Sequence, residues 1–278
     1  MGGKVCVEPQ YGIIGFYDIL GYKSFLKNNS VETVAEDINK VLHLISNIDT
    51  YITKQTLRIF NKTNTKIAKR LLKEMKWFIF SDTIIQISIF QKDEKTDEYN
   101  KWLIFLIASL CLNRLMFKYG LPLRGAISIG SFLFENSCFA GKPCLETYEL
   151  ANKLDLSACV ITDKAHKEVE NLINSCKYPN VKKLFNVLFV KYQIPIKENN
   201  TSLKNQKNQK VCLYSLNLLT PKALKQSTIK NNIDIYKYVL NKFKKHKKSV
   251  PGKVKSKVKN TKQFLQHLVN FVINNKLN

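Results

Sequence analysis

The chain has 278 residues and is 45% hydrophobic, which excludes general disorder and suits one large domain, alone or with an appendage. Its net charge is +24, yet few of the 45 basic residues are arginines, which occur only as Arg58, Arg70, Arg114 and Arg124. Proteins that read nucleic-acid sequence usually depend on the bidentate fork of arginine, so we interpret the charge mainly as solvated lysine surface.

The seven cysteines are scattered and form no CxxC pair, a usage typical of reduced thiols in the cytosol. The N-terminal segment lacks the apolar stretch of a signal peptide. Residues 102–117 form the most apolar segment, but Asn113 and Arg114 interrupt it, and it is shorter than the about 20 residues that span a bilayer. We therefore expect a core helix there and a cytoplasmic protein without a membrane partner.

The first expected element is a buried strand over residues 11–20, a nearly unbroken apolar run that stops at Gly21. A helix is expected over residues 31–51, because apolar residues repeat there at helical spacing after Ser30, a suitable N-cap. The form of the basic, polar stretch 52–73 is left open.

Two further strands are expected at residues 77–80 and 83–90, joined tightly at Ser81 and Asp82 as a hairpin. Ser-Asp is not a favoured hairpin dipeptide, which suggests that something other than turn propensity selects the aspartate. The next elements are expected in the order helix, strand, short strand, helix and strand, at residues 101–119, 123–132, 137–140, 143–154 and 158–162.

Later strands are expected at residues 184–192 and 211–216, on either side of a polar loop at 197–210. From Pro221 onward the pattern predicts two helices separated by a break at 244–260, and the second helix carries an amphipathic stripe. The order strand–helix–hairpin–helix–strand at the start of the chain predicts an α+β, ferredoxin-like antiparallel sheet followed by a C-terminal helical extension.

Two acidic residues, Asp18 and Asp82, each end a short apolar segment. A carboxylate at the tip of a buried strand costs free energy unless it is paired or holds a metal ion. Taken singly, Asp18 could be a helix N-cap and Asp82 a simple turn residue. Their joint occurrence beside buried strands favours a shared divalent-cation site, which suits phosphoryl transfer.

The residues around these acids resemble a known family. Segment 16–22, Phe-Tyr-Asp-Ile-Leu-Gly-Tyr, resembles the first metal motif of class III nucleotide cyclases, and Ser81-Asp82 resembles their hairpin motif, where Gly-Asp is more usual. Segment 123–130 looks like their Arg-Gly-rich strand, and segment 148–154 lies over the helix that carries the transition-state Asn and Arg in the standard enzymes.

The Arg-Gly-Ala-Ile-Ser form of that strand, the Ser-Asp hairpin and the Tyr-Glu-Leu helix are similar to the bacterial Pycsar-type pyrimidine cyclases. Members of that branch make cyclic UMP or cyclic CMP in antiphage defence. The resemblance covers about residues 11–163 well and the tail only loosely. It implies a class III cyclase catalytic domain at residues 1–220 and a basic helical extension at residues 221–278.

The resemblance also implies site residues. Asp18 and Asp82, with the backbone carbonyl of Ile19, would hold two Mg²⁺ or Mn²⁺ ions per site. The β- and γ-phosphates would bind the amides that open the next helix, at Gly21, Tyr22 and Lys23. The ribose 3′-hydroxyl would then attack the α-phosphorus and release pyrophosphate.

Four positions bear on substrate and rate. Glu149 stands where the standard enzymes orient the ribose with Asn, and Lys153 stands at the transition-state Arg position. Lys153 can still neutralise developing charge; Arg124 is a second cationic candidate, whose alternative role is a structural salt bridge. Phe78 replaces the Lys that specifies adenine, which argues against adenylate cyclase but does not choose between uracil and cytosine.

The leading expectation is thus a metal-dependent cyclase that converts UTP or CTP to the 3′,5′-cyclic nucleotide. It would act as a homodimer with both sites at the subunit interface and signal to a separate cyclic-nucleotide effector protein. One alternative, motivated by Glu149 and Lys153, is a non-enzymatic nucleotide sensor on the same fold. Another is a nucleic-acid-binding protein that uses the lysine cluster at 244–248; we interpret that cluster as a solvated linker and do not expect a nucleic-acid partner.

Overall fold

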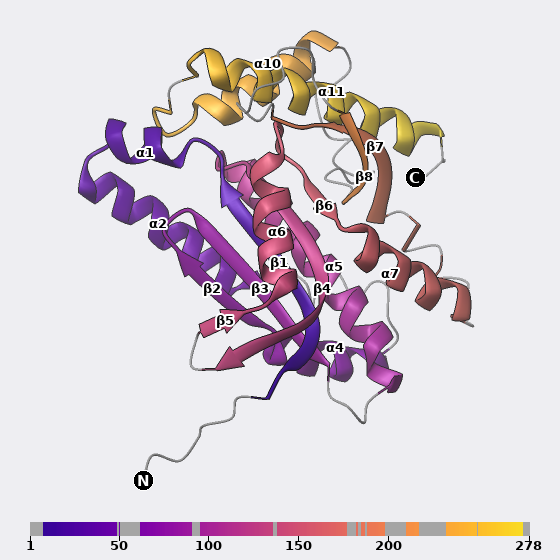
Figure 1. The fold of residues 1–278 in the computed structure, drawn as a ribbon. Coiled ribbons are helices and arrows are strands. Elements are labelled where there is room, and N and C mark those ends of the chain that lie inside the picture. Colours follow the sequence, from indigo (N-terminus) through magenta and orange to yellow (C-terminus); the bar gives the residue numbers. More distant parts are fainter. Residues whose placement is uncertain are drawn as a thin grey trace, which may run out of the picture.

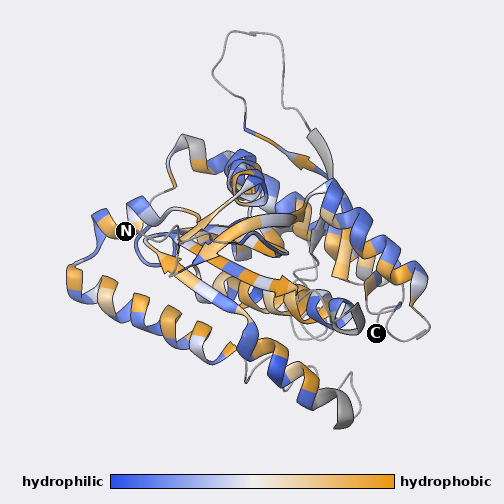
Figure 2. Ribbon diagram, turned by 60° about the horizontal axis from the view of Figure 1, so that its bottom comes forward, coloured by the Kyte–Doolittle hydropathy of each residue, from blue (hydrophilic) through white to orange (hydrophobic). Residues whose placement is uncertain are grey.

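The computed structural model describes residues 8–48, 62–90, 95–135, 138–176, 188–197, 210–216, 232–248 and 250–274, with residues 50, 182, 185 and 186 between these ranges. Figure 1 shows a twisted sheet with helix α6 against one face and helix α5 against the other. The hydropathy colouring places apolar residues on the strands and on the inner faces of the helices (Figure 2). The core therefore lies between the sheet and the helices that cover it.

The first half of the chain builds a four-stranded unit. Its elements are β1 (Gln10–Ile19), α1 (Tyr22–Asn28), α2 (Val31–Ser46), α4 (Lys62–Glu74), β2 (Lys76–Phe80), β3 (Thr83–Phe90), α5 (Lys95–Tyr119) and β4 (Leu123–Glu135). The strands lie in the order β2-β3-β1-β4, and each neighbouring pair is antiparallel. This is the strand order of a ferredoxin-like βαββαβ unit, so the expected fold class is confirmed.

The second half widens the sheet and covers it. Its elements are β5 (Cys138–Ala140), α6 (Lys142–Lys153), β6 (Cys159–Ile161), α7 (Asp163–Ser175), β7 (Phe189–Pro195), β8 (Lys210–Leu216), α10 (Asn232–Lys244) and α11 (Gly252–Asn274). Strand β6 pairs with β4 in parallel, and β8 and β7 follow it in the sheet. The sheet is therefore mixed, with one parallel pair among the strands that the structure describes.

Several expected boundaries shift. The strand expected to begin at residue 184 begins at Phe189, because residues 185, 186 and 188 are helical. The expected break at 244–260 is shorter, since α11 already begins at Gly252. The open stretch 52–73 holds α4 at its end, α7 was not predicted, and most of the loop expected at 197–210 lies outside the described residues.

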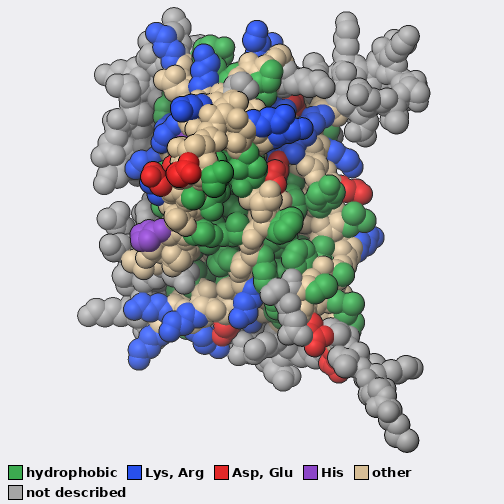
Figure 3. All heavy atoms as spheres, turned by 90° about the vertical axis from the view of Figure 1, so that its left-hand side faces the viewer, with side chains coloured by type: hydrophobic (Ala, Val, Ile, Leu, Met, Phe, Trp, Pro, Cys, Tyr) green, Lys and Arg blue, Asp and Glu red, His purple; other side chains and the backbone are tan. Residues whose placement is uncertain are grey.

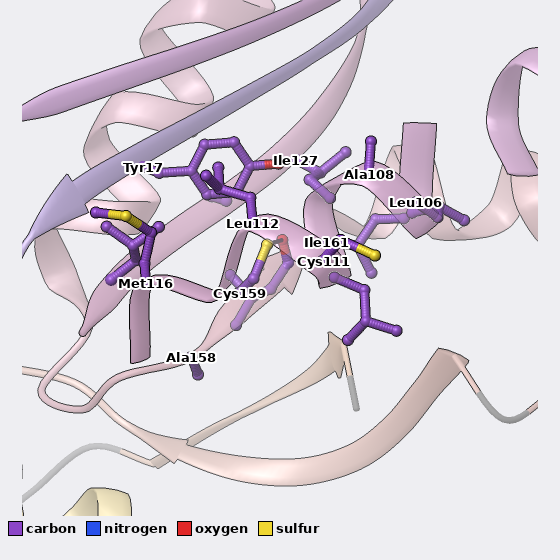
Figure 4. Close-up of a cluster of buried hydrophobic side chains, with 14 of the residues drawn as sticks. Tyr17, Leu106, Ala108, Cys111, Leu112, Met116, Ile127, Ala158, Cys159 and Ile161 are labelled. Carbon is purple, nitrogen blue, oxygen red and sulfur yellow. Dashed lines mark hydrogen bonds between the residues drawn. The ribbon is translucent and has the colours of Figure 1, made fainter. Parts of the chain in front are cut away.

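Helix α5 is the central helix of the core. By length and composition it could cross a membrane, but most of its apolar stretch is buried within the fold, with Trp102 and Phe105 fully covered. It is apolar all round because the sheet covers one side, while α2, α4 and α10 contact the helix as well. Figure 4 shows side chains of α5 packed against β1, β4 and β6. The expected core helix is confirmed.

The C-terminal helices share this core. Val239 and Phe243 of α10 and Phe264 and Leu268 of α11 are buried in the same hydrophobic cluster as the sheet. The stripe predicted on the last helix thus packs on the body of its own chain. The division into a domain at 1–220 and an extension at 221–278 stays a prediction.

The lysine-rich segment 244–248 was expected to be a solvated linker, and this is wrong in part: Lys244, Lys245 and Lys247 are exposed, but the turn is bonded to the fold and Lys248 is buried. Residues His246 and Lys247 have left-handed backbone angles (φ 58° and 53°), which turn the chain back onto the body of the protein. Lys248 is buried and donates to the backbone oxygen of Gly120 (2.6 Å), and its aliphatic stem lies against Gly21. Burial lowers the pKa of Lys248 to about 7.

A buried ion pair holds this turn in place. The ring nitrogens of His246 lie 2.7 Å from a carboxylate oxygen of Asp37 and 3.0 Å from the backbone oxygen of Tyr119. The hydroxyl of Tyr119 also donates to Asp37 (3.0 Å), so one carboxylate ties together α2, α5 and the turn.

We expect Asp37→Ala to lower the free energy of unfolding by about 2 kcal/mol, because it leaves charged and polar partners without their acceptor. Burial would raise the pKa of Asp37, but the hydrogen bond from Tyr119 and the charge of His246 outweigh it, and the pKa is lowered. The ionised Asp37 carboxylate therefore stabilises the folded protein fully when the pH is above 3.8, the ordinary pKa of an aspartate. This stabilisation is lost as the pH falls through the lowered pKa.

Denaturant unfolding at pH 7 and at pH 3 measures both effects. Glu36→Ala is the matched control, since Glu36 is an exposed neighbour that forms an ion pair with Lys40 at 3.9 Å. If the Asp37→Ala protein is as stable at pH 7 as the Glu36→Ala protein, Asp37 does not have the stabilising role assigned to it.

Candidate active site

The two predicted acids meet at one end of the sheet. In the β1–β3 register Asp18 is paired with Thr83, so Asp82 lies beside it in the hairpin turn. The backbone N–H of Ile19 donates to the backbone oxygen of Asp82 (2.9 Å), which continues the pairing past the end of β3. The carboxyl groups of Asp18 and Asp82 are close enough for Asp82 to raise the pKa of Asp18.

The hairpin turn that carries Asp82 is conformationally costly. Phe80 pairs with Thr83, which leaves Ser81 and Asp82 as a two-residue turn. Ser81 has a left-handed backbone (φ 56°), a region that favours glycine, and Gly is the residue that the resembling motif more often has there. Strain of this kind is characteristic of functional turns.

The electrostatics of the acidic pair are unfavourable without a cation. Burial raises the pKa of Asp18, the neighbouring Asp82 carboxyl raises it further, and Arg124 only partly offsets both. The net shift is upward, so the ionised form of Asp18 costs free energy in the folded protein. A divalent cation between the two carboxylates would relieve that cost.

Arg124 is bound to the acidic pair. Its Nε donates to Asp18 Oδ2 at 2.5 Å, and its two terminal nitrogens donate to the backbone oxygen and to Oδ1 of Asn152, at 3.0 and 2.7 Å. The structure thus shows the salt bridge that the sequence left as the alternative role of Arg124. Gly125 follows Arg124 because a Cβ there would collide with the ring of Tyr17 on the paired strand.

Lys197 is a cation of this site that the sequence did not indicate. It follows β7, and its Nζ donates to the backbone oxygen of Asn152 at 2.6 Å. Burial lowers the pKa of Lys197 to about 8, and the nearby charges of Arg124 and Lys257 add to the effect. No sequence signal distinguishes Lys197 from the many other lysines, because its place depends on how β7 meets the end of α6.

Glu149 and Lys153 lie on α6 and form an ion pair with each other at 3.8 Å. Both side chains are about half exposed. The structure gives neither of them a hydrogen bond or ion pair with Asp18 or Asp82. On the same helix, the ring of Tyr148 meets the ring of Phe16 of β1 edge-on, with centroids 5.4 Å apart.

The start of α1 lies next to the acidic turn. The helix expected to open at Gly21, Tyr22 and Lys23 begins at Tyr22, and Gly21 precedes it with a left-handed backbone (φ 82°). Tyr22 lies beside the hairpin: burial and the charge of Asp82 raise the pKa of Tyr22, while its hydrogen bond with Ser81 opposes the shift. Lys23 is exposed to solvent.

Phe78 lies in an aromatic cluster on the sheet face that α6 covers only in part. Its ring centroid is 5.7 Å from that of Phe134 and 5.9 Å from that of Phe139. Phe78, which stands where the adenine-specific enzymes have a Lys, is thus part of an apolar aromatic surface. Cys138 is exposed nearby on β5.

The donor set fits magnesium or manganese held partly by substrate. Within the described residues no three His, Cys, Asp or Glu side chains gather around one point. Mg²⁺ is commonly held by one or two carboxylates together with substrate phosphates, rather than by an all-protein cage. Asp18 and Asp82 supply those carboxylates, and the Ile19 carbonyl follows directly in the chain.

No family model matches the chain, and no curated protein matches it in sequence. Among solved structures, it is similar to the catalytic core of a rhodopsin-guanylyl cyclase with converted specificity in complex with ATPαS. That match has a TM-score of 0.45 at 12% identity and covers 75% of this chain and 95% of the other.

A bacterial light-regulated adenylyl cyclase matches with a TM-score of 0.39 at 14% identity, over 78% of this chain and 55% of the other. A class III adenylyl cyclase-like ATP-binding protein from Pseudomonas aeruginosa matches with a TM-score of 0.36 at 16% identity, over 64% of this chain and 40% of the other. At these identities and TM-scores the matches carry no argument about function. The fold assignment stands on the strand order itself.

Proposed function

We propose that the protein is a metal-dependent nucleotide cyclase that acts on UTP or CTP. The observation that carries the proposal is the meeting of Asp18 and Asp82, two acids 64 positions apart in the chain, at a strained turn beside the start of α1. A raised pKa at Asp18 is the mark of a site arranged for a ligand rather than for stability.

Asp18, Asp82 and the Ile19 carbonyl would hold Mg²⁺ or Mn²⁺. When bound, the ions would neutralise triphosphate charge and favour ionisation of the ribose 3′-hydroxyl. The amides of Gly21, Tyr22 and Lys23 would bind phosphate oxygens at the helix start.

Arg124 and Lys197 add positive charge beside Asp18, where the negative charge of a triphosphate would need it. The 3′-hydroxyl would attack the α-phosphorus and pyrophosphate would leave. Lys153 would offset charge in the transition state, and Glu149 would contact the ribose.

A homodimer is supported by the partly open sheet face. Phe80 is 81% exposed, and Leu145 and Tyr148 of α6 are 57% and 52% exposed. Hydrophobic side chains gather in the middle of the face that forms the left-hand side of Figure 1, and basic residues lie above and below them (Figure 3). A second copy would cover this surface and bring its own α6, with Lys153 and Glu149, toward the acidic pair.

Incubating the protein with ATP, GTP, CTP and UTP in turn, each with Mn²⁺, tests the proposal and identifies the base. We expect a 3′,5′-cyclic pyrimidine nucleotide and an equal amount of pyrophosphate. The absence of any cyclic product from folded protein would contradict the proposal. In a cell the product would act in the cytoplasm on a separate effector protein, and we place that signal in antiphage defence.

A nucleotide sensor without turnover is the second candidate. Two ion pairs favour a sensor, Glu149 with Lys153 and Asp18 with Arg124, because in each pair the opposite charges neutralise each other within the protein. A sensor would bind a nucleoside triphosphate without releasing pyrophosphate, so the same assay separates the two. Of the lysines at 244–248, Lys248 is buried and bonded within the fold, which reduces the cluster that a nucleic acid could contact.

A further inference from the structure

Asn152, at the end of α6, is the shared acceptor for two cations. Its side-chain oxygen and its backbone oxygen accept from the two terminal nitrogens of Arg124, at 2.7 and 3.0 Å. The same backbone oxygen accepts from Lys197 Nζ at 2.6 Å. Two parallel acceptors of this kind match the planar fork of a guanidinium and fix its orientation.

The arrangement concentrates positive charge. The charge of Arg124 lies close enough to Lys197 to lower its pKa, and neither side chain is exposed to solvent. Asp18 and Asp155 are the acidic groups whose charges reach Lys197. The last turn of a helix, with its free carbonyls, is a favourable place for such cations, which explains why they meet at the end of α6.

The C-terminal helix braces this end of α6 through Asp155. Asn260 of α11 donates to the backbone and side-chain oxygens of Asp155, at 2.9 and 3.0 Å, and Lys257 forms an ion pair with it at 3.7 Å. The backbone N–H of Ser157 donates to the buried hydroxyl of Thr261, also on α11, at 2.9 Å.

Strand β7 completes the brace. The N–H of Asp155 donates to Pro195 O at 3.0 Å, and the N–H of Lys197 donates to Lys153 O at 2.8 Å. Lys197 is therefore held against the end of α6 by its backbone as well as by its side chain.

We propose that Asn152 is a positioning residue that holds Arg124 and Lys197 as a pair of cations facing the triphosphate, and that α11 keeps it in place through Asp155. This inference rests on the proposed function, since it names residues that prepare the same site. It gives the C-terminal helix an indirect part in that site, through Asp155.

The test measures binding of inorganic tripolyphosphate with Mg²⁺ to the full-length protein by calorimetry. Asn152→Leu keeps the size of the side chain but removes its acceptor, and we expect about tenfold weaker binding because Arg124 loses one of its two fixed contacts. Asn152→Asp, which retains an acceptor, should keep Arg124 in place and bind more tightly than Asn152→Leu. Asn270→Leu, at an exposed position of α11, is the matched control and should bind like wild type.

A pH series adds a readout that a purely structural role would not move. Wild-type affinity should fall as the pH rises through about 8, where Lys197 loses its proton, and Lys197→Met should remove that step. Asn260→Ala, which loosens the brace without touching the cations, should weaken binding by a smaller factor. Wild-type affinity and an unchanged pH profile in folded Asn152→Leu and Asn260→Ala would overturn the proposal.

The failures of the two proposals are distinguishable. If no nucleotide is cyclised but tripolyphosphate binding still depends on Asn152, the positioning role stands and the cyclase assignment fails. If Asn152→Leu cyclises its nucleotide with the KM and kcat of wild type, the positioning role fails and the cyclase assignment stands.

Discussion

Asp18→Asn should abolish cyclic-nucleotide formation and leave the protein at least as stable as wild type. An amide cannot replace a carboxylate that holds a divalent ion, so the rate should fall by about 1,000-fold or more. The raised pKa of Asp18 means that its charge opposes folding at neutral pH, and the neutral amide removes that opposition. A combined measurement of product formation and melting temperature checks both parts.

The sign of this effect follows from the direction of the pKa shift. A carboxyl whose pKa is raised by folding makes the folded state less stable above its ordinary value of 3.8, where the unfolded chain is already ionised. A residue retained for stability would show the opposite shift, as Asp37 does. Asp18→Asn with wild-type turnover would contradict the proposed role.

Two controls sharpen the result. Asp82→Asn should lose activity to a similar extent, since the two carboxylates act on the same ions. Asp163→Asn makes the same chemical change at an exposed position in the first turn of α7 and should keep full activity.

Replacing Phe80 or Leu145 with Glu should yield a folded monomer with no measurable cyclase activity. Both side chains are more than half exposed, so a charge there costs the subunit little, whereas burying that charge in a dimer interface costs several kcal/mol. Light scattering gives the mass, and circular dichroism confirms that the subunit is folded. A variant that stays dimeric and active would exclude this face as the interface.

Complementation tests the shared site directly. If each site combines Asp18 of one subunit with Lys153 of the other, mixing the inactive Asp18→Asn and Lys153→Ala proteins creates dimers with one intact site. Random exchange should then restore roughly one quarter of the wild-type rate. No recovery after proven subunit exchange would contradict a site shared between subunits.

The fold was predictable from the sequence because its signals are local. The apolar runs of β1 and β3, the Ser30 cap, which accepts from the N–H of Thr33, and the glycine after α5 each mark an element without knowledge of its neighbours. The proximity of Asp18 and Asp82 was predictable too, since one acid lies at the end of β1 and the other in the hairpin turn of the same antiparallel unit.

What could not be predicted depends on contacts between distant segments. Lys197 and Asn152 meet because β7 ends beside α6, a register that neither segment encodes alone. The local sequence at 245–248 predicts a run of solvated lysines. In the structure, His246 of this turn pairs with Asp37, which lies more than 200 residues earlier in the chain. Ser81 shows that a residue can adopt a left-handed turn against its own preference when the surrounding pairing requires it.

The most direct test of the account is the binding of Mn²⁺ in the presence of a non-cyclisable analogue of the preferred nucleotide, measured by electron paramagnetic resonance. The account predicts two bound ions per site in the wild-type protein and loss of binding in both Asp18→Asn and Asp82→Asn. Undiminished Mn²⁺ binding in folded protein that lacks either carboxylate would contradict it.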